Sequence, residues 1–280
     1  MKTKNFIVPH DFSNVADTAL EHAIATAKHV NAEINVLHVV AKGKDLKEAE
    51  QQLNSVLAKF DSSVKLIPNV RIGSIFEDIG DFAAEKHAEL IFMGTHGIQG
   101  WQHITGSNAL KVINSSSVPF IIVQEKSPKD SGYDDIIVPL DLNKETKQKL
   151  AVVAEIATYF KSRVHVITPD ESDEFLKKQV KANILFASKF FSERGIDVTT
   201  TVAPSHNFDN EIVKHAVAIG ADNKITAAVV DVGGFLGMGE KPVALTSDML
   251  RLVTDPKSNE VVFTVTATQE QLEAMPSYAN

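Results

Sequence analysis

The stretch Phe6-Ile7-Val8-Pro9-His10-Asp11-Phe12-Ser13 decides the fold, because a close copy of it returns 130 residues later. The copy reads Ile136-Ile137-Val138-Pro139-Leu140-Asp141-Leu142-Asn143. At the same spacing, Ile34-Asn35-Val36-Leu37 returns as Val164-His165-Val166-Ile167. Repeated stretches at one fixed spacing indicate two tandem copies of a single folding unit.

Short apolar strands alternate with amphipathic helices in each copy. In the first copy we expect strands at 6–9, 34–40, 64–70, 90–93 and 118–123, and helices after Ser13 and at 46–60, 75–87 and 107–115. In the second copy we expect strands at 136–140, 163–167 and 197–202, and helices at 144–160, 172–194 and 208–219. This alternation predicts an α/β fold with a doubly wound, mostly parallel five-stranded sheet that is Rossmann-like and occurs in two tandem copies.

The composition excludes several functional classes. The chain has 280 residues, a formal net charge of −8 and no cysteine. The acidic excess argues against nucleic-acid and anionic-membrane partners, and the missing cysteines rule out disulfides, thiolate nucleophiles and Cys-ligated metals. The apolar run Phe6–Val8 is too short for a signal-peptide core, and no stretch is long enough for a membrane span. We therefore expect a cytoplasmic protein.

Polar and glycine residues follow several strands of the first copy, at the edge where doubly wound sheets bind ligands. Asp11 follows the first strand and could accept hydrogen bonds from ribose hydroxyls, while the main chain near Val39 could pair with a purine. Glycines let backbone N–H groups approach an anion, and the N-terminus of a helix favours negative charge. The glycines and their neighbours that would do so are Gly94, Gly97, Gly106, Ser107 and Asn108. The pattern predicts a nucleotide site without a Walker lysine.

The first 126 residues resemble a universal stress protein domain, whose fold is similar to that of the adenine nucleotide alpha hydrolases. The resemblance is carried by Val8–Ser13, Leu37–Val40, Met93–Gly97, Gly106-Ser107 and Val118–Val123. ATP-binding members have glycine, two residues, glycine, nine residues, glycine, then Ser or Thr. The resemblance implies ATP or another adenine nucleotide, with Asp11 and Val39 at the nucleoside and Gly94 at the ribose. Gly97, Gly106, Ser107 and Asn108 would contact the phosphates.

The chain departs from this family pattern at three points. Only eight residues separate Gly97 from Gly106, position 10 is His10 where the family often has Thr, and Trp101 lies in the loop that would cover the phosphates. The alternative is that the glycines serve only tight strand-to-helix packing. In that case the protein is a nucleotide-free adaptor that binds partners through the Gly97–Gly106 loop and the C-terminal tail.

The rest of the chain divides into three parts. Residues 127–133 are polar and form a predicted linker, and residues 134–222 resemble a degenerate second universal stress protein domain without the glycine motif. Residues 223–280 resemble part of a PRC-barrel domain in the run from Gly233 to Lys241. This tail either forms a separate half-barrel or completes the second sheet. In the second reading Ile225–Asp231 becomes strand four, Thr246–Leu252 a helix and Val261–Thr266 strand five.

The apolar strand Val118–Val123 is expected at an open edge of the first sheet, and open edges promote association. The family resemblance implies that such edges pair. We expect either an intramolecular pseudo-dimer, with Val261–Val265 as the partner strand, or a homodimer.

Catalysis and metal binding have little support in the sequence. None of the nucleophile, P-loop or zinc-protease motifs is present, so we predict no catalytic residues and at most slow ATP hydrolysis. His10, His38 and His96 each follow a strand and could converge on a metal, but we expect none to be bound; His22 and His29 are expected to face solvent. The two functional hypotheses are a nucleotide-responsive stress-response module and a nucleotide-free adaptor.

Overall fold

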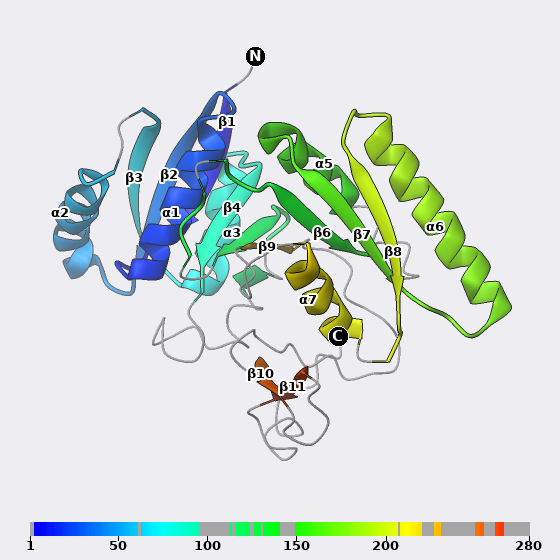
Figure 1. Cartoon of the computed structure of the whole chain (residues 1–280). Coiled ribbons are helices and arrows are strands. Elements are labelled where there is room, and N and C mark those ends of the chain that lie inside the picture. The colour runs from blue at the N-terminus through cyan, green and yellow to red at the C-terminus, as the bar shows by residue number, and fades with distance from the viewer. Residues whose placement is uncertain are drawn as a thin grey trace.

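The computed structural model describes residues 3–60, 63–95, 112–113, 116–123, 126–129, 131–140, 149–206, 208–219, 227–230, 250–254 and 261–265 (Figure 1). Two mainly parallel sheets lie side by side, each with its own helices. Within the described residues, no helix is long and apolar enough to cross a bilayer.

The first sheet contains five parallel strands in the order β3-β2-β1-β4-β5. The chain starts in the middle of the sheet, moves to one edge and then returns to build the other side, so the strand order reverses between β1 and β4. This confirms the predicted fold class. The strands are β1 (Lys4–Pro9), β2 (Ala32–Val40), β3 (Lys65–Ile72), β4 (Leu90–Gly94) and β5 (Phe120–Val123).

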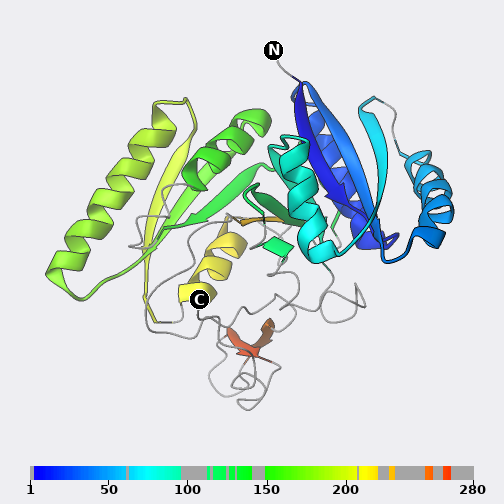
Figure 2. The ribbon, with the colours of Figure 1, turned by 180° about the vertical axis from the view of Figure 1, so that it is seen from behind.

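Helices cover both faces of this sheet. On one face α1 (Asn14–Ala27) and α2 (Leu46–Leu57) bury a core that includes Phe6, Leu20 and Leu53. On the other face α3 (Ile75–Glu85) covers a second core, as the reverse view shows (Figure 2). The short helix η1 spans Gly43–Asp45. Ser13 and Ser74 cap α1 and α3 through their hydroxyl oxygens.

The second sheet repeats the first part of this topology. Its described strands β6 (Asp135–Pro139), β7 (Arg163–Pro169) and β8 (Val198–Ala203) are parallel and lie in the order β6-β7-β8. The described helices are α5 (Lys149–Phe160), α6 (Glu174–Ser192) and α7 (Phe208–Ala218). The apolar face of the sheet packs on α5 and α6 around Val166 and Phe191.

The two copies share a packed contact. Ile156 and Phe160 of α5 join the core cluster of the first sheet. His22 of α1 is only 1% exposed, and its ring nitrogens bond the Tyr133 hydroxyl at 2.7 Å and the Lys126 carbonyl at 2.9 Å. The prediction that His22 faces solvent is therefore wrong, because the segment between the copies covers that side of α1. His29 is exposed as expected.

The described part of the segment between the copies is itself packed. Gly132 adopts φ +78°, and a Cβ at this position would lie 2.1 Å from the Phe160 ring. Tyr133 contacts the same ring edge-on at 5.0 Å between centroids. This segment therefore helps to join the two copies rather than acting as a loose tether.

The open edge of β5 has an intramolecular partner, but not the one that was expected. Strand β9 (Ala227–Val230) pairs antiparallel with β5, and β11 (Val261–Val265) instead pairs antiparallel with β10 (Leu250–Thr254). Thus Ala227–Val230 lies in the first sheet rather than in the second, and Leu250–Leu252 is extended rather than helical. Any extended segment can satisfy the main-chain groups of an edge strand, so sequence alone could not choose the partner.

Replacing Gly132 with alanine tests the packed contact between the copies. A methyl group there meets the Phe160 ring, so we expect a loss of about 1–3 kcal/mol beyond the cost of positive φ. Gly195→Ala is the matched control, because Gly195 has φ +70° but open space around it and should cost about 1 kcal/mol. Urea unfolding of both variants measures the difference. Equal losses would show that the contact contributes nothing.

Truncation after Asp222 tests whether β9 protects the first sheet. Removing β9 exposes the main-chain groups along β5, so the shortened chain should self-associate while the full chain does not. Sedimentation velocity at several protein concentrations would detect this. If the shortened chain sediments as a monomer with unchanged stability, then β9 does not protect the edge.

Candidate functional site

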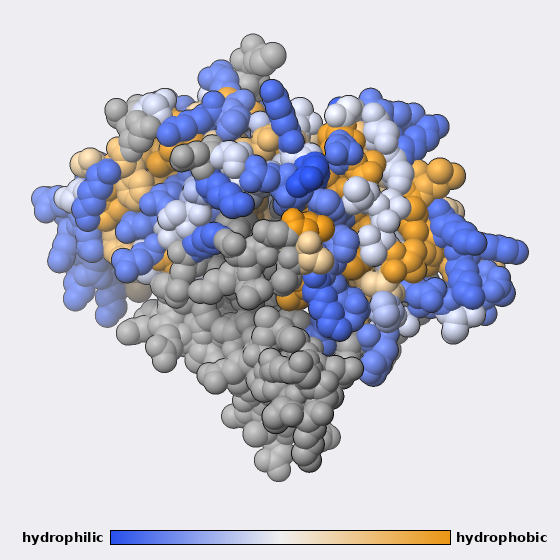
Figure 3. Space-filling model, viewed as in Figure 1, coloured by the Kyte–Doolittle hydropathy of each residue, from blue (hydrophilic) through white to orange (hydrophobic). Residues whose placement is uncertain are grey.

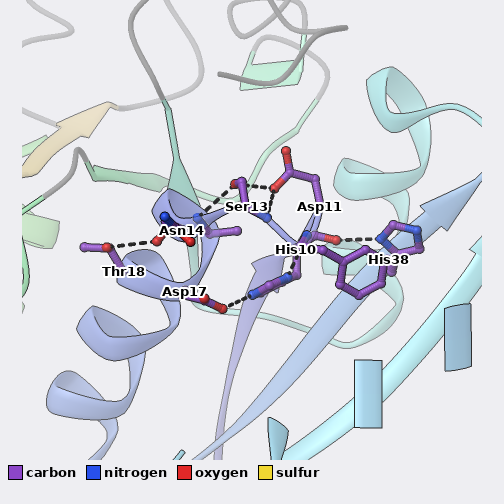
Figure 4. Close-up of polar contacts among 9 residues, drawn as sticks. His10, Asp11, Ser13, Asn14, Asp17, Thr18 and His38 are labelled. Carbon is purple, nitrogen blue, oxygen red and sulfur yellow. Dashed lines mark hydrogen bonds and ion pairs between the residues drawn. The ribbon is translucent and has the colours of Figure 1, made fainter. Parts of the chain in front are cut away.

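The candidate site lies at the carboxyl ends of β1 and β2, next to the position where the strand order reverses (Figure 4). Strand β1 ends at Pro9, whereas β2 continues to Val40. The chain leaves β1 through residues 10–13 and enters α1 directly. This stagger between two neighbouring strands makes room for a short polar loop above the end of β1.

Asp11 occupies this loop in a fixed orientation. Its Oδ1 accepts hydrogen bonds from the Ser13 amide at 3.1 Å and from the Ser13 hydroxyl. Its Oδ2 accepts no hydrogen bond from the residues that the structure describes. Asp11 is half-buried, so its carboxylate lies at the edge of the sheet with one oxygen that no described residue engages.

Val39 offers main-chain groups beside Asp11. The Leu37 carbonyl accepts a hydrogen bond from His10 N at 2.8 Å, so Leu37 directs its main-chain groups toward β1. Val39 lies two residues further on and directs its groups to the same side. The pairing of β1 with β2 stops at Pro9 and Leu37, so no strand residue lies opposite Val39 there. Val39 is in register with Arg71 of β3 on one side, while on the β1 side, next to the loop that carries Asp11, no described strand residue lies opposite it.

Gly94 has a packing role that does not depend on any ligand. It is buried at the end of β4, and a Cβ would lie 2.4 Å from the Val15 carbonyl oxygen of α1. The close approach of α1 to β4 leaves no room for a side chain at position 94. This agrees, for Gly94, with the alternative that the glycines serve tight strand-to-helix packing. The other predicted phosphate contacts, Gly97, Gly106, Ser107 and Asn108, lie outside the described residues, as does Trp101.

His10 is the residue whose importance the sequence analysis missed. Its side chain is buried, with Nε2 3.0 Å from Asp17 Oδ1 and Nδ1 3.1 Å from the Phe12 amide nitrogen, which donates to it. His38 donates from Nδ1 to the His10 carbonyl at 2.7 Å. Burial lowers the pKa of His10 below its ordinary value, although Asp17 opposes this shift. The one signal in the sequence was that His10 departs from the family pattern.

The histidines do not assemble a metal site in the part of the chain that is described. His10 and His38 are close together, but both use ring nitrogens in hydrogen bonds to protein groups. His96 lies outside the described residues. Across the described ranges, no group of three or more histidine or acidic side chains could hold a metal ion.

A polar cluster in the second copy was also missed. His165 bonds Asp135 Oδ1 through Nε2 and Thr199 Oγ1 through Nδ1, both at 2.8 Å, and its ring lies 5.9 Å from that of His215. Arg163 pairs with the same Asp135 carboxylate at 2.9 Å. Burial and the neighbouring His165 lower the pKa of His215.

The repeat contains the signal for this cluster. Asn5 and Asn35 of the first copy align with Asp135 and His165 of the second, and Phe82 aligns with His215. The two asparagine side chains make only a long contact of 3.5 Å, whereas their counterparts Asp135 and His165 are joined by a hydrogen bond of 2.8 Å. Comparing the two copies position by position would have identified these residues.

Known proteins resemble the chain most clearly in its first copy. The universal stress protein family matches residues 2–124. A universal stress protein of Methanocaldococcus jannaschii is 33% identical over 144 residues, which cover 45% of this chain and 84% of that protein. Universal stress protein G of Escherichia coli O157:H7 is 26% identical over 141 residues, covering 43% of this chain and 99% of that protein.

A solved structure resembles a larger part of the chain. The crystal structure of a universal stress protein from Archaeoglobus fulgidus superimposes with a TM-score of 0.60 at 19% identity, covering 79% of this chain and 85% of that one. At this identity the likeness concerns the fold alone, and it extends beyond the first copy. Together with the sequence matches to the first copy, these findings show that the chain belongs to the universal stress protein family.

Proposed function

We propose that this universal stress protein is a non-catalytic stress-response module that binds ATP or another adenine nucleotide at the carboxyl edge of its first sheet. One observation carries the proposal: among the described residues, Asp11 lies at the end of β1 with its Oδ2 free of hydrogen bonds, and no strand residue lies opposite Val39 on the β1 side. In this proposal the protein is cytoplasmic. Residues 1–126 form the first universal stress protein domain, residues 134–222 a degenerate second one, and residues 223–280 the tail.

The chemistry of a nucleoside fits these groups. A purine edge presents a donor and an acceptor, and a residue in a parallel strand directs its N–H and C=O to the same side. Val39 can therefore pair with a purine as a neighbouring strand would. A carboxylate next to that pairing position is suited to accept hydrogen bonds from ribose hydroxyls, which is the role proposed for Asp11.

The phosphates would bind to the glycine-rich segment that follows β4. We assign them to Gly97, Gly106, Ser107 and Asn108 on the family pattern, since N–H groups at the start of a helix bind anions. Gly94 remains next to the ribose in this proposal, but its lack of a side chain is already explained by its contact with α1.

A catalytic role has less support than binding. The Oδ1 atom of Asp11 is engaged by Ser13, and the pKa of nearby His10 is lowered while its two ring nitrogens are both hydrogen-bonded. Neither group is arranged as a free general base. Slow ATP hydrolysis is the most that we would expect from the site.

The adaptor hypothesis has an observation of its own. Phe175 and Leu185 of α6 are 66% and 71% exposed, and Phe186 and Val202 are also exposed. Figure 3 shows apolar residues gathered over α6 and β8 on the side facing the viewer. Such a surface suits a protein partner. This surface lies on the second copy and differs from the Gly97–Gly106 loop and the tail, through which the adaptor hypothesis expects partners to bind; that loop lies outside the described residues.

Substituting Asp11 tests the nucleotide site. Asp11→Asn keeps an acceptor for Ser13 but removes the charge, so we expect ATP affinity to fall about tenfold in calorimetric titration. Asp141→Asn is the matched control, because Asp141 is the repeat counterpart in the copy that lacks the glycine motif, and it should bind ATP like the unmodified chain. If the unmodified chain binds no ATP at millimolar concentration and carries no nucleotide after purification, the adaptor hypothesis replaces this one.

A further inference from the structure

His10 holds the loop that carries Asp11 by two bonds from one buried ring. The Phe12 N–H donates to Nδ1 at 3.1 Å, and Nε2 lies 3.0 Å from Asp17 Oδ1 of α1. A backbone N–H can only donate, so Nδ1 must be unprotonated and the ring proton must lie on Nε2, directed at Asp17. The ring is therefore held as one neutral tautomer between the loop and the helix.

The bond to Phe12 stabilises an unfavourable backbone conformation. Phe12 has φ +68°, in the left-handed region, which costs a residue other than glycine about 1–2 kcal/mol. Its ring lies between the two histidines, with centroids 5.9 Å from His10 and 4.2 Å from His38. This bend lies directly after Asp11 and brings the Ser13 amide and hydroxyl onto the Asp11 carboxylate.

His10 also connects the two residues assigned to the nucleoside. His38 donates to the His10 carbonyl at 2.7 Å, and each histidine directly precedes a proposed contact residue, Asp11 or Val39 (Figure 4). The position of the Asp11 carboxylate relative to the Val39 main chain is thus set by hydrogen bonds that meet at His10.

The second copy shows that the chain can leave the first strand of the repeat without this histidine. There Leu140 replaces His10 and is equally buried, and Leu140 N still donates to Ile167 O at 2.8 Å, as His10 N does to Leu37 O. The strand ending itself therefore does not need an imidazole. The imidazole occurs in the copy that retains most of the candidate site.

We propose, on the basis of the nucleotide site proposed above, that His10 is a positioning residue whose protonation releases the Asp11 loop and weakens nucleotide binding. A protonated Nδ1 becomes a donor and faces the Phe12 N–H, so that hydrogen bond is lost. The left-handed bend at Phe12 then loses its support, and Asp11 is no longer held toward Val39.

The groups around His10 set the direction of the pH dependence. Burial lowers its pKa most strongly, Asp17 of α1 and Asp11 of the loop raise it, and His38 of β2 lowers it further. The net result is a pKa below the ordinary value. The ring is therefore neutral at neutral pH, and binding should weaken as the pH falls below about 6.5.

The first test measures ATP affinity by calorimetry from about pH 4.5 to 7.5, a range that extends well below the ordinary histidine pKa because burial lowers the pKa of His10. The unmodified chain should bind about fivefold more weakly at the acidic end. His10→Asn keeps an acceptor near the Phe12 N–H but cannot titrate, so its affinity should depend less on pH. His10→Leu, which copies the second half of the repeat, should bind weakly throughout. Ratios between variants at one pH cancel the ionisation of ATP itself.

The second test follows the Phe12 amide by NMR during a pH titration without nucleotide. Its shift should titrate with His10 in the unmodified chain and stay constant in His10→Asn. A constant Phe12 amide, or the same affinity profile in both proteins, overturns the inference. If no ATP binds at any pH, the proposed function and the affinity effect both fail, while the amide titration still decides whether His10 holds the bend.

Discussion

The stagger between β1 and β2 is the constraint on which the candidate site depends. Because β1 ends at Pro9 and β2 continues to Val40, the last described bond between them runs from His10 N to Leu37 O, and beyond it β2 has no described strand neighbour on the β1 side. The loop that starts at this point must turn immediately into α1, whose first turn is capped by Ser13. The positions of Asp11, Phe12 and Val39 all follow from this short connection.

The two copies use one backbone frame for different chemistry. The first strand of each copy ends in the same main-chain bond to its neighbour, yet the residue that donates it is His10 in the first copy and Leu140 in the second. Toward the opposite ends of these strands it is the second copy that has the hydrogen-bonded histidine. The asparagine pair of the first copy is replaced there by the Asp135–His165 pair. A duplicated fold retains its topology under such exchanges because the hydrogen bonds of the sheet are made by the main chain.

The contact between the copies depends on groups that neither copy needs for its own sheet. His22 faces the connecting segment, Gly132 makes room for Phe160, and β9 covers the edge of β5. Each of these features removes a surface that an isolated copy would expose. The order of the strands and the join between the copies are therefore separate properties of the chain.

The sequence by itself determined the repeated strand–helix order, the parallel five-stranded first sheet and the place of Asp11 at the end of the first strand, because these depend on local periodicity and on short spacings. Only the tertiary structure decided that His22 is buried, that His10 holds Phe12 and Asp17, that Gly94 is required by α1, and that β5 pairs with Ala227–Val230 rather than Val261–Val265. The physical reason is that these contacts join residues distant in sequence, or side chains whose partners depend on how the chain turns. Neither hydrophobic period nor motif spacing contains that information.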